Sequence, residues 1–182
     1  MKKLSWLLVT TSSLTLTSCL SSGGQSSSAA SSTSSAMYWN VGSFPLTIKA
    51  SSDFSASERA LLNDMAFEWE DIGVQGDAGD DYNFFSAASG GTLTSVADPG
   101  HASVSSYRDS TLGIYLLNNW PSDFSSSALA VTQLWGIRGG SGISITHFDI
   151  FYNQDLYDFY TDPADAGLTA NTYDMGTIAL HE

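Results

Sequence analysis

The amino-acid sequence predicts an α+β domain that contains a sheet and two helices. Three observations support this fold class. Residues 55–72 carry apolar side chains at the three- and four-residue spacing of an amphipathic helix. Several apolar runs between residues 112 and 152 have the length and the aromatic or β-branched content of strands. A second helical run begins near Tyr173 and Asp174 and continues to Glu182.

The first 36 residues are expected to lie outside this domain. Residues 1–18 have the pattern of an export signal, because Lys2 and Lys3 precede an apolar run shorter than the roughly 20 residues that span a membrane. The run ends in Leu-Thr-Ser-Cys19, which resembles the lipobox of bacterial lipoproteins. The resemblance implies cleavage before Cys19 and attachment of lipid to its thiol. An ordinary secretory signal followed by a stray cysteine is the alternative.

Residues 19–36 form a Ser-, Gly- and Ala-rich stretch after Cys19. Such a composition buries too little apolar surface to fold, so we expect a flexible tether. No aspartate follows Cys19 in this stretch to suggest retention at the inner membrane. The sequence therefore predicts an exported lipoprotein held at the outer membrane or cell surface. Since Cys19 is the single cysteine, no disulfide can form within the chain.

Residues 37–182 have the length of one domain, which we expect to be monomeric. The chain of 182 residues has a net charge of −13, and loss of Lys2 and Lys3 with the signal takes it to −15. Nonspecific nucleic-acid binding is disfavoured, because it requires Lys and Arg to neutralise phosphates. Solubility outside the cell explains the acidity best, with calcium binding as the alternative. The remaining strong cations are Lys49, Arg59, Arg108 and Arg138.

The first half of the domain is predicted to hold one strand and the long helix. Residues 44–49 alternate between apolar and polar side chains, as in a strand. Ser55 and Glu58 have the spacing of a capping box that opens a helix. The helix is expected to run to about Asp71, with Gly73 ending it. Its apolar face consists of Leu62, Met65, Trp69 and Ile72.

The second half is predicted to be mostly strands joined by polar loops. A compact apolar run at 112–117 indicates a buried strand, and a Gly-rich turn joins two further strands at 129–135 and 143–152. In the last strand, the alternation places Ile143, Ile145, His147 and Asp149 on one face. The other segments are a strand near 82–87, an irregular stretch at 88–110 and loops at 122–127 and 153–171.

Three stretches together resemble the metzincin zinc proteases, in particular matrixin-like bacterial members. They are Ala-Leu-Ala-Val-Thr-Gln at 128–133, Ile-Thr-His-Phe-Asp-Ile-Phe-Tyr-Asn at 145–153, and Tyr-Asp-Met-Gly-Thr-Ile-Ala-Leu-His-Glu at 173–182. The resemblance covers residues 44–182. It implies a twisted mixed sheet, a long first helix and an active-site helix. The C-terminal subdomain of the family would be missing.

The dipeptide His181-Glu182 matches the start of the family motif H-E-x-x-H-x-x-G-x-x-H. The resemblance implies that His181 is the first ligand of a catalytic zinc ion and that Glu182 is the general base. The function implied is hydrolysis of peptide bonds in extracellular proteins by a water that zinc activates. A catalytic zinc site needs three protein ligands, so the chain as given is expected to be incomplete and inactive.

The remaining candidate residues have weaker support. The resemblance implies that residues 145–151 form an edge strand, with Ile145, His147 and Asp149, that pairs with an extended substrate. His147 is a candidate ligand of a structural zinc, although a hydrogen-bonded histidine is the more common case. A loop with several carboxylates is a candidate calcium site, although a solvated acidic loop is the simpler interpretation. Its acidic residues are Asp77, Asp80 and Asp81.

A non-enzymatic surface lipoprotein, acting as a binding or adhesion module, is the second functional hypothesis. A serine or cysteine hydrolase is disfavoured, because the single cysteine is the expected lipidation site and no Gly-x-Ser-x-Gly motif occurs.

Overall fold

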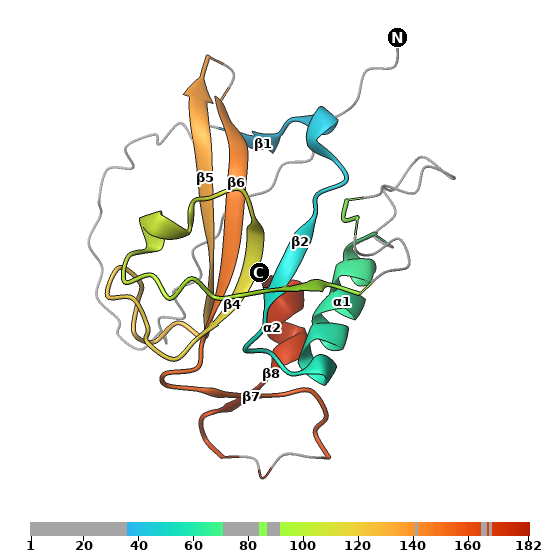
Figure 1. Ribbon diagram of the computed structural model, residues 1–182, viewed down its shortest axis with the longest axis vertical. Coiled ribbons are helices and arrows are strands. Elements are labelled where there is room, and N and C mark those ends of the chain that lie inside the picture. The colour runs from blue at the N-terminus through green and yellow to red at the C-terminus, as the bar shows by residue number, and fades with distance from the viewer. Residues whose placement is uncertain (1–35, 71–83, 87–91, 141, 165–166, 168) are drawn as a thin grey trace, which may run out of the picture.

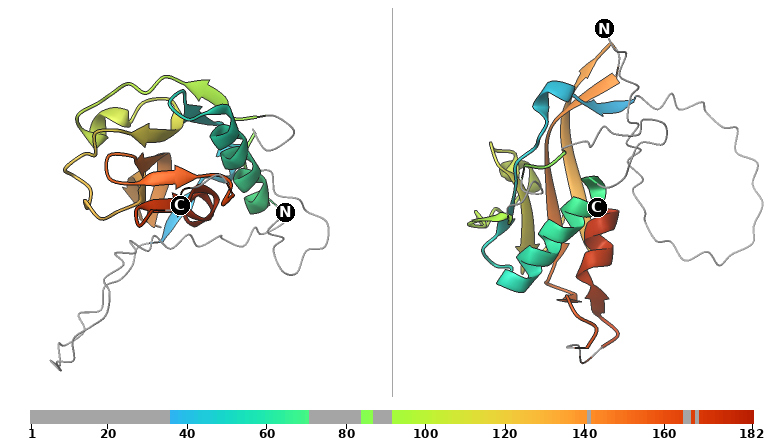
Figure 2. Two further views of the ribbon diagram at one scale, coloured as in Figure 1. Left: turned by 90° about the horizontal axis from the view of Figure 1, so that it is seen from below. Right: turned by 90° about the vertical axis from the view of Figure 1, so that its right-hand side faces the viewer.

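The computed structural model describes residues 36–70, 84–86, 92–140, 142–164, 167 and 169–182. These residues form a mostly parallel six-stranded sheet, a separate two-stranded sheet and two α-helices that lie side by side (Figures 1 and 2). The predicted α+β fold class is therefore confirmed at this level. None of the helices in the described ranges is both long enough and apolar enough to span a bilayer.

The main sheet is built around β6 (Gly142–Asn153), its longest strand. β4 (Leu112–Leu117) pairs in parallel with the second half of β6, and β1 (Met37–Trp39) pairs in parallel with its first residues. β5 (Ala130–Gly139) runs antiparallel along β6. The remaining elements are β2 (Ile48–Ser51), β3 (Thr94–Val96), β7 (Asp158–Tyr160), β8 (Thr172–Asp174), α1 (Ala56–Glu70), α2 (Met175–His181) and the 3-10 turns η1 (Val41–Ser43) and η2 (Val104–Tyr107).

The predicted strand at 112–117 is confirmed as β4, and the predicted strand pair is found as β5 and β6. The strand predicted at 44–49 is found as β2, which begins at Ile48 rather than residue 44, since Leu46 makes only an isolated bridge to Phe85. Two stretches expected to be irregular contain the short strands β3 and β7. Each is held by a parallel partner, β2 for β3 and β8 for β7.

Both helices begin with the side-chain caps that their sequences specify. The Ser55 N–H donates to Glu58 Oε2 at 2.6 Å, and the Glu58 N–H donates to Ser55 Oγ at 3.2 Å, which confirms the capping box of α1. Asp174 caps α2 by accepting a 2.6 Å hydrogen bond from the Thr177 N–H. The predicted apolar face of α1 is wrong at Trp69, whose side chain is 41% exposed.

The sheet is covered on both faces. Leu62 of α1 and Met175 of α2 belong to one core, together with Phe148 and Tyr152 of β6. The opposite face of β6 contributes Phe151 to a second, aromatic core; its other buried members are Val104, Tyr107, Tyr115 and Leu117. Burial on both faces explains why most of β6 is apolar rather than alternating.

β6 also carries a bulge in its pairing with β5. His147 pairs with Trp135 of β5, whereas Ile145 pairs with the next β5 residue, Gly136. Thr146 therefore has no partner of its own on β5. Because a bulge inserts one residue and bends the strand, the pairing of β5 with β6 is interrupted at Thr146.

Candidate active-site helix and a buried histidine–aspartate pair

The two residues that match the zinc-protease motif stand at the last turn of α2, beside strand β5. His181 is exposed and Glu182 is half-buried. The Glu182 N–H continues the helix by donating to the Ile178 carbonyl at 3.0 Å. The Thr132 hydroxyl of β5 donates to Glu182 Oε2 at 2.8 Å and lies 3.2 Å from the Glu182 main-chain oxygen. The carboxylate of Glu182 is thus oriented by an adjacent strand.

Tyr152 lies on the same face of the sheet as Thr132. It pairs with Ala130, two residues before Thr132 on β5, so Tyr152 and Thr132 are diagonal cross-strand neighbours. The Tyr152 side chain is fully buried, and its hydroxyl has no hydrogen-bond partner among the described residues. Burial, followed by the negative charge of Glu182, raises the pKa of Tyr152 above its ordinary value.

His147 and Asp149 form a buried pair. His147 Nε2 lies 3.0 Å from Asp149 Oδ2, and the Gly113 N–H donates to Asp149 Oδ1 at 2.9 Å. The indole of Trp135 packs 5.0 Å from the His147 ring, measured between centroids. Burial raises the pKa of Asp149 to about 6, although the hydrogen bonds from Gly113 and His147 act in the opposite direction. His147 is therefore a hydrogen-bonded buried histidine.

The sheet separates these two groups of residues. Trp135, which contacts His147, packs against the aromatic core, whereas Glu182 lies over the face that carries Thr132 and Tyr152. His181 and His147 therefore do not converge on one ion. Within the described ranges, no three His, Cys, Asp or Glu side chains are placed to hold a metal. Cys19 and the predicted calcium ligands Asp77, Asp80 and Asp81 lie outside those ranges.

The prediction that residues 145–151 form an edge strand is wrong. β6 is paired with β5 along one side, and its other side is paired with β1 at residues 143–145 and with β4 at residues 149–153. Ile145 and Asp149 consequently have a partner strand on both sides, whereas His147 is paired with β5 only. Among the described residues, β5 pairs with β6 alone and is therefore a free edge of the sheet, as β3 is at the opposite end.

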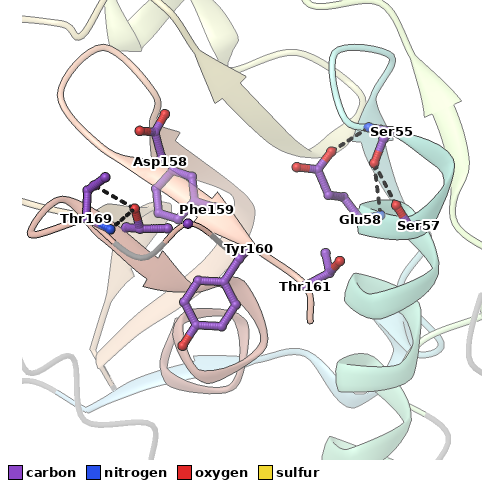
Figure 3. A pocket seen from close by; sticks show the side chains of 10 residues that line it. Ser55, Ser57, Glu58, Asp158, Phe159, Tyr160, Thr161 and Thr169 are labelled. Atoms are coloured by element: carbon purple, nitrogen blue, oxygen red, sulfur yellow. Dashed lines mark hydrogen bonds between the residues drawn. The ribbon is translucent and has the colours of Figure 1, made fainter. Parts of the chain in front are cut away.

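Two open pockets lie away from the end of α2. One, of about 420 Å³, is lined by His147 and by residues of β1 and the turn before β4, including Trp39 and Asp109. The other, of about 340 Å³, lies between the start of α1 and the small β7–β8 sheet (Figure 3). Its Ser55, Glu58 and Thr169 side chains already bond to neighbouring groups of the pocket wall. Neither pocket contains His181 or Glu182.

Sequence reasoning identified His181 and Glu182 but missed Thr132 and Tyr152 as their neighbours. Both missed residues occur in strand patterns where nothing local marks them, and only the packing of α2 against the sheet brings them to Glu182. Comparisons with protein-family models, with curated proteins and with solved structures found no match. The function must therefore be inferred from the geometry of the site.

Proposed function

We propose that residues 37–182 belong to the catalytic domain of a zinc-dependent endopeptidase of the matrixin-like metzincin type. One observation carries the proposal: α2 presents His181 and Glu182 beside strand β5, and Thr132 of that strand holds the Glu182 carboxylate. The mixed sheet, the long helix α1 and the terminal helix α2 support the same resemblance. The protein would then be a peptide hydrolase in which Glu182 is the acid–base residue and the edge strand β5 holds its carboxylate.

The residues present fit a catalytic zinc ion only in part. His181 is exposed at the last turn of α2, so its imidazole is accessible to a metal. A catalytic site takes three protein ligands, and the described residues supply one. The proposal therefore requires two further ligands from elsewhere in the protein. When bound, zinc would supply the Lewis acid that peptide hydrolysis needs at neutral pH.

Glu182 is proposed to act as the general base that accepts a proton during hydrolysis. The hydrogen bond from Thr132 restricts the rotation of its carboxylate. An extended peptide added along the free edge of β5 would run beside this carboxylate, which is the β-augmentation mode of peptide binding. The substrate strand is thus reassigned from residues 145–151 to a position alongside β5, with Thr132 as the point of closest approach to Glu182.

The proposed setting is the outer membrane or cell surface of a bacterium, with lipid on Cys19 as the anchor and extracellular proteins as substrates. A monomer suffices for this arrangement. Calcium binding at Asp77, Asp80 and Asp81 is part of the same proposal and is tested by measuring bound calcium. These features rest on the composition and motifs of the sequence.

Two measurements test the enzymatic proposal. The first is the coding sequence immediately after the codon of Glu182, where a histidine is expected three positions on. Such a residue would lie one turn after His181 on a continued α2, so that both imidazoles share one face. A stop codon at this point would favour the non-enzymatic surface lipoprotein instead.

The second measurement is casein hydrolysis by the protein with its full zinc-ligand set. Activity should be abolished by a chelator, restored by zinc, and lost in Glu182→Gln. Glu68→Gln, which changes an exposed glutamate on α1, is the matched control and should retain activity. Full activity of Glu182→Gln would refute the assignment of the base.

A further inference from the structure

A gap in the main sheet lies beside the middle of β6. β1 pairs with residues 143–145 of β6, and β4 pairs on the same side with residues 149–153 (Figure 1). Between these two ladders, residues 146–148 have no partner strand on this side among the described residues. The pocket of about 420 Å³ lies at this gap, since residues of β1, of the turn before β4 and of β6 line it. Small-molecule sites commonly have volumes of roughly 300–1,000 Å³.

The pocket has a negative charge on its wall and no positive one. Asp109 lines it, and no lysine or arginine is found among the described lining residues. The Thr111 N–H donates to Asp109 Oδ1, but no described cation lies within ion-pair distance of this carboxylate. A second carboxylate, that of Asp149, lies 3.0 Å from Nε2 of the lining residue His147. A cleft whose charges all have one sign attracts ligands of the opposite sign, so the pocket favours a cation.

An aromatic ring forms another part of the wall. The ring of Trp39 is held by two neighbours, with centroid distances of 6.5 Å to Phe44 and 5.9 Å to Phe148. Trp39 is only half-buried, so part of the indole stays accessible. Indole is the side chain that attracts an ammonium or guanidinium group most strongly through its π-electrons. His147, which is 5% exposed and bonded to Asp149, adds a wall that is already fixed.

We propose that this pocket binds an organic cation, namely the ammonium or guanidinium group of the kind that Lys and Arg side chains carry. Asp109 accepts a hydrogen bond from the bound cation, and Trp39 contacts its apolar stem and its charge. A metal ion fits less well, because no three His, Cys, Asp or Glu side chains in the described ranges are placed to hold one. The pocket contains neither His181 nor Glu182, so this binding does not depend on the proposed peptidase activity.

The test is a titration of the ¹⁵N-labelled full chain with the Nα-acetyl amides of lysine and arginine, followed by nuclear magnetic resonance. The indole N–H signal of Trp39, assigned by its loss in Trp39→Phe, should shift and reach saturation. The Nα-acetyl amide of norleucine has a similar stem without the charge and should leave this signal unchanged. Cadaverine separates the two sources of the cation: equal affinity assigns the site to free amines, and weaker affinity assigns it to basic side chains of peptides. If no cation produces a saturable shift, or norleucine binds as tightly as lysine, the proposal is overturned.

Three variants locate the binding in the pocket. Asp109→Asn keeps an acceptor for the Thr111 N–H but loses the charge, so the affinity for both cations should fall about tenfold. Asp123→Asn changes an exposed aspartate outside the pocket lining and should bind like the wild type. Ser110→Lys introduces a competing cation from an exposed lining position and should abolish binding while the protein stays folded. Unchanged affinity in both Asp109→Asn and Ser110→Lys would mean nonspecific association with the acidic surface, and the proposal would be refuted.

Discussion

Replacing Asp149 with asparagine isolates the effect of one buried carboxyl group on the pH dependence of stability. Asp149 is fully buried, with Gly113 N–H on Oδ1 and His147 on Oδ2. Asparagine has nearly the same shape, keeps an acceptor for the Gly113 N–H and offers an amide to His147. The substitution therefore removes the titrating group while disturbing the packing little.

The size and sign of the effect follow from the pKa of Asp149. Burial raises that pKa from 3.8 to about 6, a difference of 6 − 3.8, or roughly 2.2 pKa units. At 1.36 kcal/mol per unit, this corresponds to about 3 kcal/mol. Because the folded state binds the proton more tightly than the unfolded state, the contribution is fully present below about pH 3.8. It is lost as the pH rises through about 6.

The free energy of unfolding of wild type relative to Asp149→Asn should therefore fall by about 2 kcal/mol between about pH 4 and pH 7, because part of the contribution is already lost at pH 4. Urea denaturation at a series of pH values, followed by tryptophan fluorescence, measures this difference. Asp123→Asn, which changes an exposed aspartate, should give a curve parallel to that of the wild type. A difference that rises with pH would mean that the pairing with His147 outweighs burial, and the reasoning would be refuted.

Three further substitutions test individual contacts by urea denaturation or thermal melting. Thr132→Val removes the donor to Glu182 Oε2 and should lower the free energy of unfolding by about 1 kcal/mol; an equal loss in Thr111→Val, the same exchange away from Glu182, would contradict this role. Ser55→Ala removes the cap of α1 and should cost about 1 kcal/mol, whereas Ser57→Ala should cost less; equal losses would contradict the capping role. Gly113→Ala brings a Cβ into collision with the Tyr115 ring and should destabilise by roughly 1–3 kcal/mol, so an unchanged midpoint would contradict the close approach of that ring.

The features that sequence alone predicted correctly are those with local causes. Ser55 and Glu58 specify the start of α1 through a contact three residues apart, and the apolar run at 112–117 becomes β4. The short strand β3 could not be predicted in this way. Its residues Thr94-Ser95-Val96 have no distinctive pattern, and parallel pairing with β2 holds them in place. Such pairing depends on contacts between residues that are far apart in the sequence.

The expectation that residues 145–151 form an edge strand was the main error, and it has the same physical origin. The patterns at 129–135 and 143–152 identify two strands, but no local signal states which of them has a second partner. β4 pairs with β6 across a long stretch of sequence, which leaves β5 at the edge. The surroundings of Glu182 could not be predicted from the sequence for the same reason. The motif identifies Glu182, but its contact with Thr132 spans fifty positions of the chain and emerges only on folding.

The strand order also decides which residues can act together. With β6 inside the sheet, its side chains point into two separate cores, so Tyr152 faces α2 while Asp149 interacts with the aromatic residues Tyr107 and Tyr115. Variants of the buried histidine–aspartate pair therefore probe the stability of the sheet. Variants of Thr132 probe the orientation of Glu182. The hydrogen bonds of Asp149 run to Gly113 and His147, and neither residue contacts the hydrogen bond between Thr132 and Glu182, so the two sets of variants test different contacts.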